Sequence, residues 1–383
     1  DLHLLSRRQR QMCIRDRTII GGGNGAFAAA SDLTIRGHQI TLYELPQFAK
    51  NLEEVSQRGG IELEAFENNG LTGGFAKLYK ITTDIEEALA ESEIVMIVVP
   101  AYSLQTIAEL CAPHLRENQI VALCPANPGG SLVFRHTMTA MGYHTKIWIA
   151  EFSCMMYACR KKSPSSIWIR GYKHNLGVAF FPSEGSEPAF ERLHVLYPFT
   201  VRYRNVIETG FSNLNTTLHT SLMLLNAANI DNKEDRLFYR ECSSSPSLDN
   251  LLSWLDQERL ALNTLPDMHV LSVAEIEKVW YEHQGAAGNT ATEILHSLKH
   301  YAYSKMPTSM DYRYITEDVP FGLIPCAQIL DALGLDHKIH TALTNVLCAV
   351  CNRDFYQEAR TLKDMGIEGM GRDRLMEYLR YGC

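Results

Sequence analysis

The sequence lacks the features that would assign the protein to a membrane or to nucleic acid. It contains no run of about 18 uncharged apolar residues, which a membrane-spanning helix requires. The net charge is −8, and lysine and arginine are scattered along the chain, so no basic field is present to attract nucleic acid or anionic lipid. We therefore expect no nucleic acid and no membrane among its partners.

The sequence also lacks the paired cysteine spacing of a zinc site, although it has ten cysteines. Cys124, Cys154, Cys159 and Cys348 stand among apolar residues, which is typical of buried free thiols in a reducing compartment. We expect no metal centre and a cytoplasmic location.

A chain of 383 residues, 46% of them hydrophobic, is long enough for two domains. Residues 1–17 carry five arginines and have neither the apolar core nor the cleavage site of a signal peptide. We interpret residues 1–17 as a non-native or disordered extension and expect the fold to begin at Thr18.

From Thr18 to about residue 205, short β-branched runs alternate with helical stretches, which is typical of a parallel sheet with crossover helices. The expected strands are TIIG, HQITLYEL, IVMIVVP, QIVALCPA, KIWIAE, LGVAFFP and TVRYRN. They predict an α/β fold with a doubly wound parallel sheet of the Rossmann type over residues 18–205.

Residues 206–383 repeat apolar side chains at intervals of three and four, which predicts helices. The clearest stretches are NLNTTLHTSLMLLNAANI, SPSLDNLLSWLDQERLALNTL, SVAEIEKVWYEH, TATEILHSLKHYAYS, CAQILDALG and HKIHTALTNVLCAVC. The chain should therefore end in an all-helical domain. Such a domain can pack on itself or on a second copy, so a homodimer is compatible with the pattern.

The first strand runs into GGGNGAF, where Gly21, Gly23 and Ala26 form G-x-G-x-x-A at the start of a helix. Gly21 permits the tight turn, Gly23 lets the backbone approach a pyrophosphate, and Ala26 lets the helix pack closely on the strand. Asn24 and Gly25 lie in the same turn. This context predicts a dinucleotide with its phosphates at the helix N-terminus.

Two further positions extend the predicted dinucleotide site. Glu44 ends the second strand, where a carboxylate accepts hydrogen bonds from the adenosine ribose and repels a 2′-phosphate. Pro100 and Ala101 end a later strand at the carboxyl edge of the sheet, where ligands bind in such folds. The pattern favours NAD over NADP.

The helical half supplies the candidate acid–base groups. His219 lies in an apolar helix, where a histidine is more often a hydrogen-bonded core residue than a catalytic one. Residues 310–330, MDYRYITEDVPFGLIPCAQIL, combine Arg313, Glu317 and Asp318 with aromatic residues before a turn that contains proline and glycine. A solvated turn would account for the charges but not for the aromatic residues.

From Thr18 onward the chain resembles the opine dehydrogenases of the octopine and nopaline type. The segments that carry the resemblance are GGGNGAF, IVVPAYS, AEFSCMMYACR, NTTLHTSLMLLNAANI and RYITEDVPFGLIP, of which the last two are the most specific. The resemblance implies a Rossmann domain, a helical domain and an active site in the cleft between them. It also implies that a nicotinamide cofactor reduces the imine formed by an amino acid and a 2-oxo acid, often pyruvate.

The resemblance assigns roles to three residues. His219 matches the catalytic histidine, Asp318 its carboxylate partner, and Arg313 an arginine that holds a substrate carboxylate. These residue types suit the chemistry, because histidine titrates near neutral pH, a carboxylate fixes its tautomer, and a guanidinium binds a carboxylate through two parallel hydrogen bonds.

The sequence departs from the family pattern in three places. Thr220 replaces a proline after the histidine, Asn127 stands where a basic residue is expected, and the polar segment NKEDRLFYRECSSSPSLDN makes Tyr239 and Arg240 weaker candidates for the amino-acid pocket.

Two other functions stay open at this point. A dehydrogenase of the glycerol-3-phosphate or ketopantoate type would need a catalytic lysine, for which Lys278 and Lys299 are available. A nucleotide-sensing binding protein would keep the fold without turnover.

Overall fold

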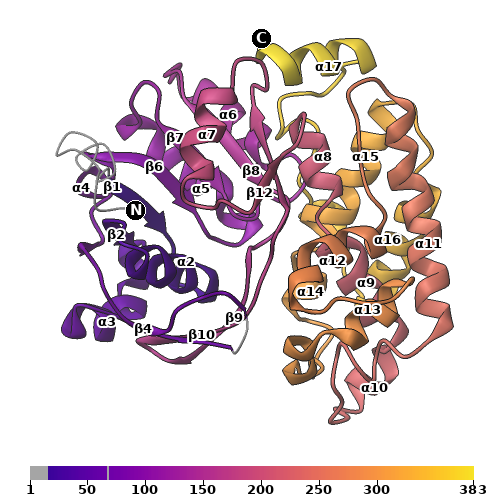
Figure 1. Ribbon diagram of the computed structural model, residues 1–383. Helices are drawn as coiled ribbons and strands as arrows, with labels where there is room; N and C mark the ends of the chain where they lie inside the picture. Colours follow the sequence, from indigo (N-terminus) through magenta and orange to yellow (C-terminus); the bar gives the residue numbers. More distant parts are fainter. Residues whose placement is uncertain (1–15, 67–68) are drawn as a thin grey trace.

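The computed structural model describes residues 16–66 and 69–383, which form two domains side by side (Figure 1). Residues 1–15 of the predicted extension lie outside the described residues. Asp16 and Arg17 belong to the first strand, so the fold starts before the expected boundary at Thr18. The pairing explains the difference, because the Arg17 amide donates to the carbonyl of Gln39 at 3.2 Å and Asp16 pairs with Ser92.

The first domain is built on an eight-stranded sheet, which confirms the predicted α/β class. All neighbouring strands in it are parallel except β8 and β11. The strands, in spatial order, are β12 (Thr200–Arg202), β11 (Leu176–Phe181), β8 (Trp148–Phe152), β7 (Ile120–Leu123), β6 (Ser92–Ile97), β1 (Asp16–Ile20), β2 (Ile40–Tyr43) and β5 (Lys80–Thr82).

Helices cover both faces of this sheet because its strands are apolar on both sides. Adjacent residues point to opposite faces, so Ile19 and Ile20 of β1 enter two different hydrophobic cores. The doubly wound arrangement is therefore confirmed. One face packs against α2 (Asn24–Ile35), α3 (Glu53–Arg58) and α7 (Glu187–His194), and the other against α4 (Ile85–Leu89), α5 (Leu104–Cys111) and α6 (Gly130–Ala140).

A second, four-stranded sheet was not predicted. Its order is β4 (Gly74–Lys77), β3 (Gly60–Ala65), β10 (Ser166–Tyr172) and β9 (Tyr157–Ser163). Helix α2 contacts all four of these strands as well as β1 and β2, so it lies between the two sheets. The antiparallel pair of β9 and β10 thereby reaches the glycine-rich turn at the start of α2.

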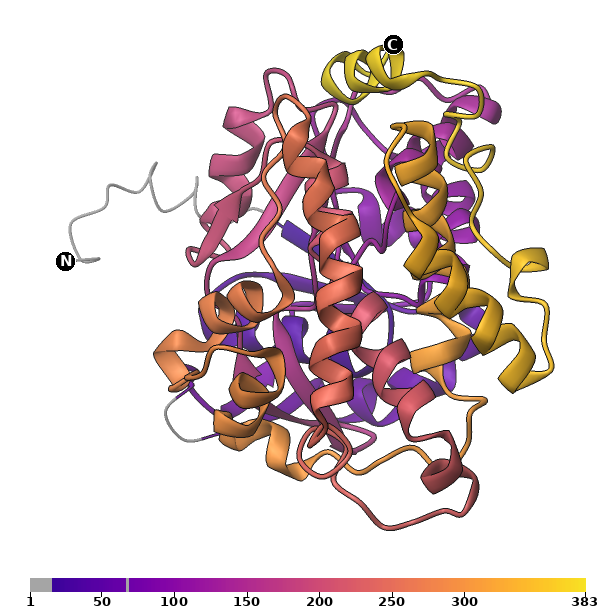
Figure 2. The same cartoon turned by 90° about the vertical axis from the view of Figure 1, so that its right-hand side faces the viewer.

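The chain changes from sheet to helix at Asn205, whose side-chain oxygen accepts from the amides of Ile207 and Glu208 and caps α8. Beyond it the described residues form helices and turns with one isolated β-bridge. The helices are α8 (Val206–Phe211), α9 (Asn215–Leu225), α10 (Ala227–Asp231), α11 (Pro246–Leu260), α12 (Val273–Tyr281), α13 (Ala291–Ser297), α14 (Arg313–Thr316), α15 (Ile324–Ala332), α16 (Lys338–Cys351) and α17 (Arg372–Tyr381) (Figure 2).

Two segments late in the chain tie the domains together. Helix α17 returns to the first domain, where Arg380 pairs with Glu184 at 2.8 Å. Arg360, which is buried, donates to the carbonyls of Ala126, Asn127 and Pro128 after β7. These contacts hold the carboxyl edge of the sheet against the helical domain.

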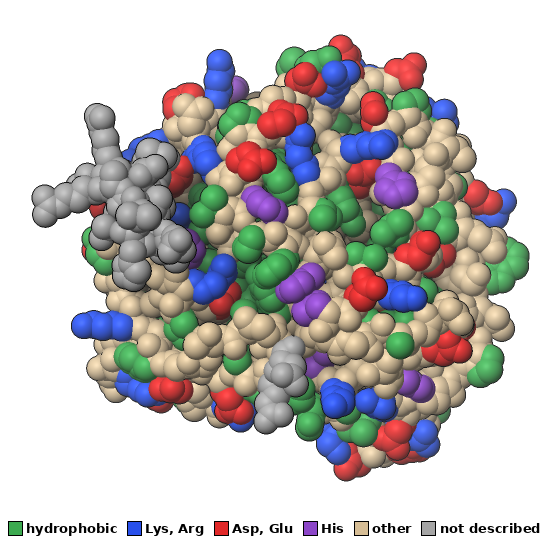
Figure 3. Space-filling model, viewed as in Figure 1, with side chains coloured by type: hydrophobic (Ala, Val, Ile, Leu, Met, Phe, Trp, Pro, Cys, Tyr) green, Lys and Arg blue, Asp and Glu red, His purple; other side chains and the backbone are tan. Residues whose placement is uncertain are grey.

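Acidic and basic side chains are interspersed over the face shown in Figure 3. Within residues 16–66 and 69–383, every helix is too short or too polar to cross a membrane.

Candidate active site

A cavity of about 330 Å³ lies between the two domains and brings most of the predicted residues together. We call it the central cavity. The predicted residues that line it are Gly23, Asn24, Gly25, Pro100, His219, Arg313 and Asp318, whereas Gly21, Ala26, Glu44 and Ala101 lie outside its lining.

The glycine-rich turn has the geometry that a dinucleotide needs. Gly21 has φ +127°, and a Cβ there would lie 2.5 Å from the carbonyl oxygen of Val98, so only glycine fits. Gly23 precedes α2 and faces open space at the cavity wall. No side chain of the described residues caps the helix, so its first amides are available to phosphate oxygens. The turn therefore fits the predicted cofactor.

Glu44 lies beside this turn at the end of β2. Its two carboxylate oxygens accept from the Leu45 amide at 3.0 Å and from Asn51 Nδ2 at 3.1 Å. A Cβ on Gly22 would clash with Glu44 Oε2, so the carboxylate is pressed against the turn. This is the expected place for a group that meets the adenosine ribose.

Sequence reasoning missed Lys161 of β9, which reaches the same turn. Its amide donates to Asn24 Oδ1 at 2.8 Å, its Nζ donates to the Gly22 carbonyl at 2.7 Å, and its ammonium lies over the ring of Phe27. Burial lowers the pKa of Lys161 to about 8, although Glu44 favours the charged form. A basic residue in an unpredicted strand gave no signal that it would meet a turn formed by residues 21–25.

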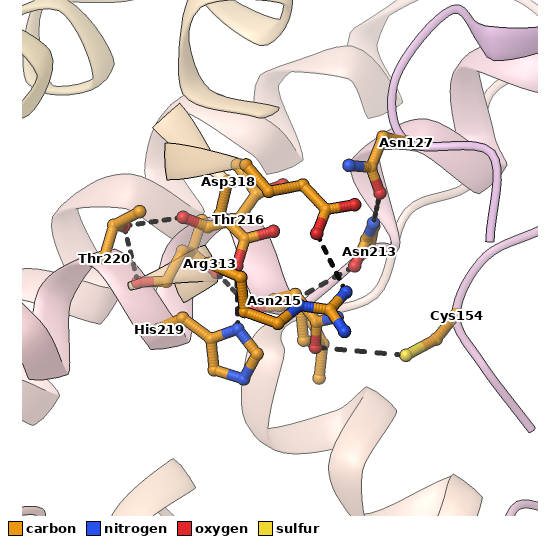
Figure 4. A network of polar contacts seen from close by, with 12 residues as sticks. Asn127, Cys154, Asn213, Asn215, Thr216, His219, Thr220, Arg313 and Asp318 are labelled. Atoms are coloured by element: carbon orange, nitrogen blue, oxygen red, sulfur yellow. Dashed lines mark hydrogen bonds and ion pairs between the residues drawn. The ribbon is translucent and has the colours of Figure 1, made fainter. Parts of the chain in front are cut away.

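His219 and Asp318 form a buried pair at the floor of the central cavity (Figure 4). His219 lies one turn into α9, and its Nδ1 is 2.8 Å from Asp318 Oδ2. Asp318 precedes a π-helical turn, Val319–Leu323, that packs on α9. Gly322 allows this approach, because a Cβ there would lie 2.6 Å from Thr216 Oγ1.

Two tyrosines complete the surroundings of the imidazole. Tyr239 Oη is 2.9 Å from His219 Nε2, and the ring of Tyr314 stacks on the imidazole at 3.8 Å between centroids. Burial raises the pKa of the Tyr239 hydroxyl well above its ordinary value, so the hydroxyl is neutral. When Nδ1–H donates to Asp318, the Tyr239 hydroxyl donates to Nε2. Tyr239 is therefore a closer partner of His219 than the sequence indicated, whereas Arg240 lies outside the cavity lining.

Arg313 reaches the central cavity from α14 with 61% of its side chain exposed. One of its terminal nitrogens is 2.8 Å from Glu317 Oε2, and Glu317 Oε1 accepts from the Ala101 amide at 2.9 Å. The amide of Ala101 thus bonds the helical domain, and the expected contact of Ala101 with a dinucleotide stays a prediction. Glu317 therefore links the strand end at Pro100 to the arginine.

The other departures from the family pattern have simple structural explanations. Thr220 is buried inside α9 and donates to the Thr216 carbonyl at 2.6 Å, so the helix continues through it. Asn127 bonds Asn213, and Arg360 supplies the positive charge to that segment. Lys278 and Lys299 are exposed and lie outside the cavity lining, so neither is placed as a catalytic lysine.

Within the part of the chain that the structure describes, no group of three His, Cys, Asp or Glu side chains is arranged to hold a metal ion.

A Rossmann domain, a helical domain and a His–Asp pair that lines the same cavity as the glycine-rich turn define a two-domain, dinucleotide-dependent dehydrogenase. The family model for the alpha-helical domain of NAD/NADP octopine/nopaline dehydrogenases matches residues 202–351. An opine dehydrogenase of Arthrobacter sp. (strain 1C) is 30% identical over 353 residues, which cover 92% of this chain and 95% of that protein. The chain belongs to the opine dehydrogenase family, whose members are NAD-dependent oxidoreductases acting on the CH–NH group, as predicted.

Solved structures share the whole fold. Octopine dehydrogenase, solved with NADH and L-arginine, superimposes with a TM-score of 0.75 at 17% identity, covering 94% of this chain and 97% of that one. By contrast, a glycerol-3-phosphate dehydrogenase of Thermoanaerobacter sp. (strain X514) is 32% identical over only 27% of this chain. The glycerol-3-phosphate dehydrogenase type thus shares only part of the sequence.

Proposed function

We propose that the enzyme condenses the amino group of an amino acid with a 2-oxo acid, preferably pyruvate, and reduces the imine at the expense of NADH. The observation that carries this proposal is the buried His219–Asp318 pair, which opens into the same cavity as the glycine-rich turn. The octopine dehydrogenase structures solved with NADH and L-arginine or with NADH and pyruvate support it by family likeness.

The cofactor would be held by residues of the first domain. Gly23, Asn24 and Gly25 would receive the pyrophosphate at the N-terminus of α2, and Glu44 would accept from the adenosine ribose. NADH supplies a hydride when it is bound. The carboxylate of Glu44 disfavours a 2′-phosphate, which supports NAD over NADP.

His219 would handle the protons of the reaction. Attack of the amine on the carbonyl gives a neutral carbinolamine. Its hydroxyl must gain a proton to leave as water, and its nitrogen must give up its remaining proton to leave a neutral imine. The imidazole is the group in the cavity whose ordinary pKa lies nearest to neutral pH. Asp318 at Nδ1 would hold the ring in the tautomer that exchanges protons through Nε2, and it would stabilise the imidazolium. His219 would also supply the one further proton that the nitrogen needs when the imine is reduced to a secondary amine.

Arg313 would hold the carboxylate of the 2-oxo acid. It is exposed to the cavity and shares only one terminal nitrogen with Glu317, so its other N–H groups can bind a carboxylate. Such a contact would fix the carbonyl carbon for hydride attack.

The proposal is tested by following NADH oxidation with pyruvate and a panel of amino acids. We expect oxidation that requires both substrates. We also expect His219→Ala to lower kcat by about 10²- to 10⁴-fold without changing the Kd of NADH, because a general acid–base group is lost. If the wild-type protein binds NADH but does not oxidise it in the presence of any tested amino acid and oxo acid, it is a nucleotide-sensing protein instead.

We also propose a cytoplasmic location, which is supported by the nine cysteines of the described residues, all of them free thiols. A homodimer stays a prediction, to be checked by light scattering.

A further inference from the structure

Arg170 occupies an irregular position in the small sheet. Ile169 of β10 pairs with Cys159 of β9, and Gly171 pairs with the next residue back, Ala158. Arg170 is therefore the extra residue of a β-bulge. Bulges redirect a side chain and occur often beside active sites. Here the side chain of Arg170 lines the central cavity.

This arginine is buried without a polar partner. Arg170 is 8% exposed, and its Nε has no hydrogen-bond partner. No carboxylate of residues 16–66 and 69–383 lies within ion-pair distance of its guanidinium. Two other buried arginines are satisfied: Arg259 pairs with Asp256 and donates to a carbonyl, and Arg360 donates to three carbonyls.

An unpaired buried guanidinium destabilises the folded protein, because it loses hydration and gains no counter-charge. The nearby Arg160 adds repulsion, so burial and Arg160 together lower the pKa of Arg170. The ring of Trp168, 5.5 Å from the guanidinium, gives only a weak cation–π contact. A bound anion would remove this penalty.

A second cavity, the outer cavity, adjoins the central one at Arg170. It measures about 440 Å³ and shares Arg160, Arg170 and Ser304 with the central cavity. Its other lining residues include the aromatic side chains Trp168, Tyr303 and Tyr312. A ligand held at Arg170 could therefore extend one part toward His219 and another part into an aromatic chamber.

We propose that Arg170, assisted by Arg160, binds the α-carboxylate of the amino-acid substrate and directs its side chain into the outer cavity. This inference rests on the proposed function. Pyruvate carries only a methyl group and needs no such chamber, whereas an amino acid presents an α-carboxylate and a side chain together. The aromatic lining favours amino acids with large apolar or aromatic side chains. Arg313 is left to the 2-oxo acid.

Arg170→Met tests the inference, because methionine keeps much of the volume and removes the charge. We expect the KM of the amino acid to rise about 10- to 100-fold, as for a lost charge-assisted hydrogen bond. The Kd of NADH and the KM of pyruvate should stay within about twofold. The Tm of the ligand-free protein should rise, since a merely structural arginine would lower it on removal.

A second comparison uses amines that lack the carboxylate. Wild-type enzyme should strongly prefer an amino acid to the amine formed by removing its carboxyl group, and Arg170→Met should lose this preference. Arg170→Lys should keep part of this preference, and its Tm should not rise as that of Arg170→Met does. Arg116→Met removes an arginine that bonds the carbonyls of Leu89 and Ser92 and is not part of the cavity lining, so it should lower the Tm and leave the preference for the amino acid unchanged.

An unchanged amino-acid KM in Arg170→Met, or a rise in the pyruvate KM instead, would overturn the inference. Failure of the proposed function gives a different result, because wild-type enzyme would then turn over no amino acid. Stabilisation of wild-type protein by the amino acid, measured as a Tm shift with NADH present, needs no turnover. If this shift persists in Arg170→Met, the inference is wrong in that case too.

Discussion

His219 has three neighbours, and each fixes a different property of the imidazole. Asp318 determines which nitrogen carries the proton, Tyr314 stacks on the ring and holds its plane, and Tyr239 occupies Nε2. In the proposed reaction, a substrate would therefore reach Nε2 through the Tyr239 hydroxyl or displace it. Since this hydroxyl lines the central cavity, we expect it to relay the proton.

Tyr239→Phe separates these roles, because it removes the hydroxyl and keeps the ring. We expect kcat to fall about tenfold or more, since the proton path to Nε2 is broken. Steady-state kinetics with saturating NADH measure the effect. Tyr301→Phe is the matched control. The ring of Tyr301 packs on that of Tyr239 with 4.6 Å between the ring centroids, but the Tyr301 hydroxyl is not among the described hydrogen-bond partners of His219. An unchanged or higher kcat in Tyr239→Phe would show that the hydroxyl only covers Nε2.

Glu277 of α12 gives a pH-dependent prediction. Burial raises its pKa from the ordinary 4.5 to about 7, although Lys173 opposes the rise. Between these values the folded protein holds a proton that the unfolded chain releases, so stability falls as pH rises through this window. Glu277→Gln cannot titrate. As the pH rises from 5 to 8, we expect the free energy of unfolding of the variant to increase by about 2 kcal/mol relative to that of wild type. Urea unfolding at each pH measures this difference.

The attraction between the ionised carboxylate and Lys173 is already contained in the pKa of Glu277. Exchange of a carboxyl group for an amide adds an offset that does not change over this range, so the slope carries the test. Glu275→Gln on the same helix is a control of opposite sign. Hydrogen bonds from Ser272 lower the pKa of Glu275, so this carboxylate stabilises the protein at neutral pH and loses that effect as pH falls. A constant difference between Glu277→Gln and wild type would contradict the assignment.

At the scale of elements, the π-helical turn Val319–Leu323 places the carboxylate of Asp318 against α9. Gly322 makes the close approach, and Gly322→Ala would bring a methyl group within 2.6 Å of Thr216 Oγ1. We expect the turn to shift away from α9. This shift should destabilise the protein by about 1–3 kcal/mol, and it should lower kcat because the His219–Asp318 contact becomes longer. Thermal unfolding and steady-state kinetics measure the two effects.

Thr216→Ala provides the matched partner for a double-mutant cycle. It removes Oγ1 and Cγ2, the two atoms that a methyl group at position 322 would meet most closely. In the Thr216→Ala background, Gly322→Ala should lower the free energy of unfolding and kcat by less than it does in wild type. Purely additive effects would mean that the close contact does not position Asp318.

The elements also show where sequence reasoning stopped. The strands of the large sheet were predictable because they are apolar runs, and His219 and Asp318 were identified by the family motifs around them. The hairpin of β9 and β10 was not predicted, because its residues ACRKKS carry charges where an apolar run is expected. Lys161 and Arg170, which this hairpin brings to the turn and the cavity, were therefore missed.

At the scale of the whole molecule, the two-domain plan followed from a change of periodicity near residue 205, where Asn205 caps the first helix of the second domain. The contacts between the domains could not be predicted. Arg360 reaches segment 126–128 and Glu317 reaches Ala101 across more than 200 residues of sequence, and no local pattern encodes such pairings. The cavity that joins His219 to the glycine-rich turn depends on them.

The central claim is that this cavity forms a carbon–nitrogen bond and reduces it. The most direct measurement is mass spectrometry of the product made from pyruvate, an amino acid and NADH carrying deuterium at the transferable position. The account predicts a secondary amine with the summed mass of the two substrates less one oxygen atom, with one deuterium on the former carbonyl carbon of pyruvate. Deuterated lactate without a carbon–nitrogen bond, or no product from an enzyme that binds NADH, would contradict it.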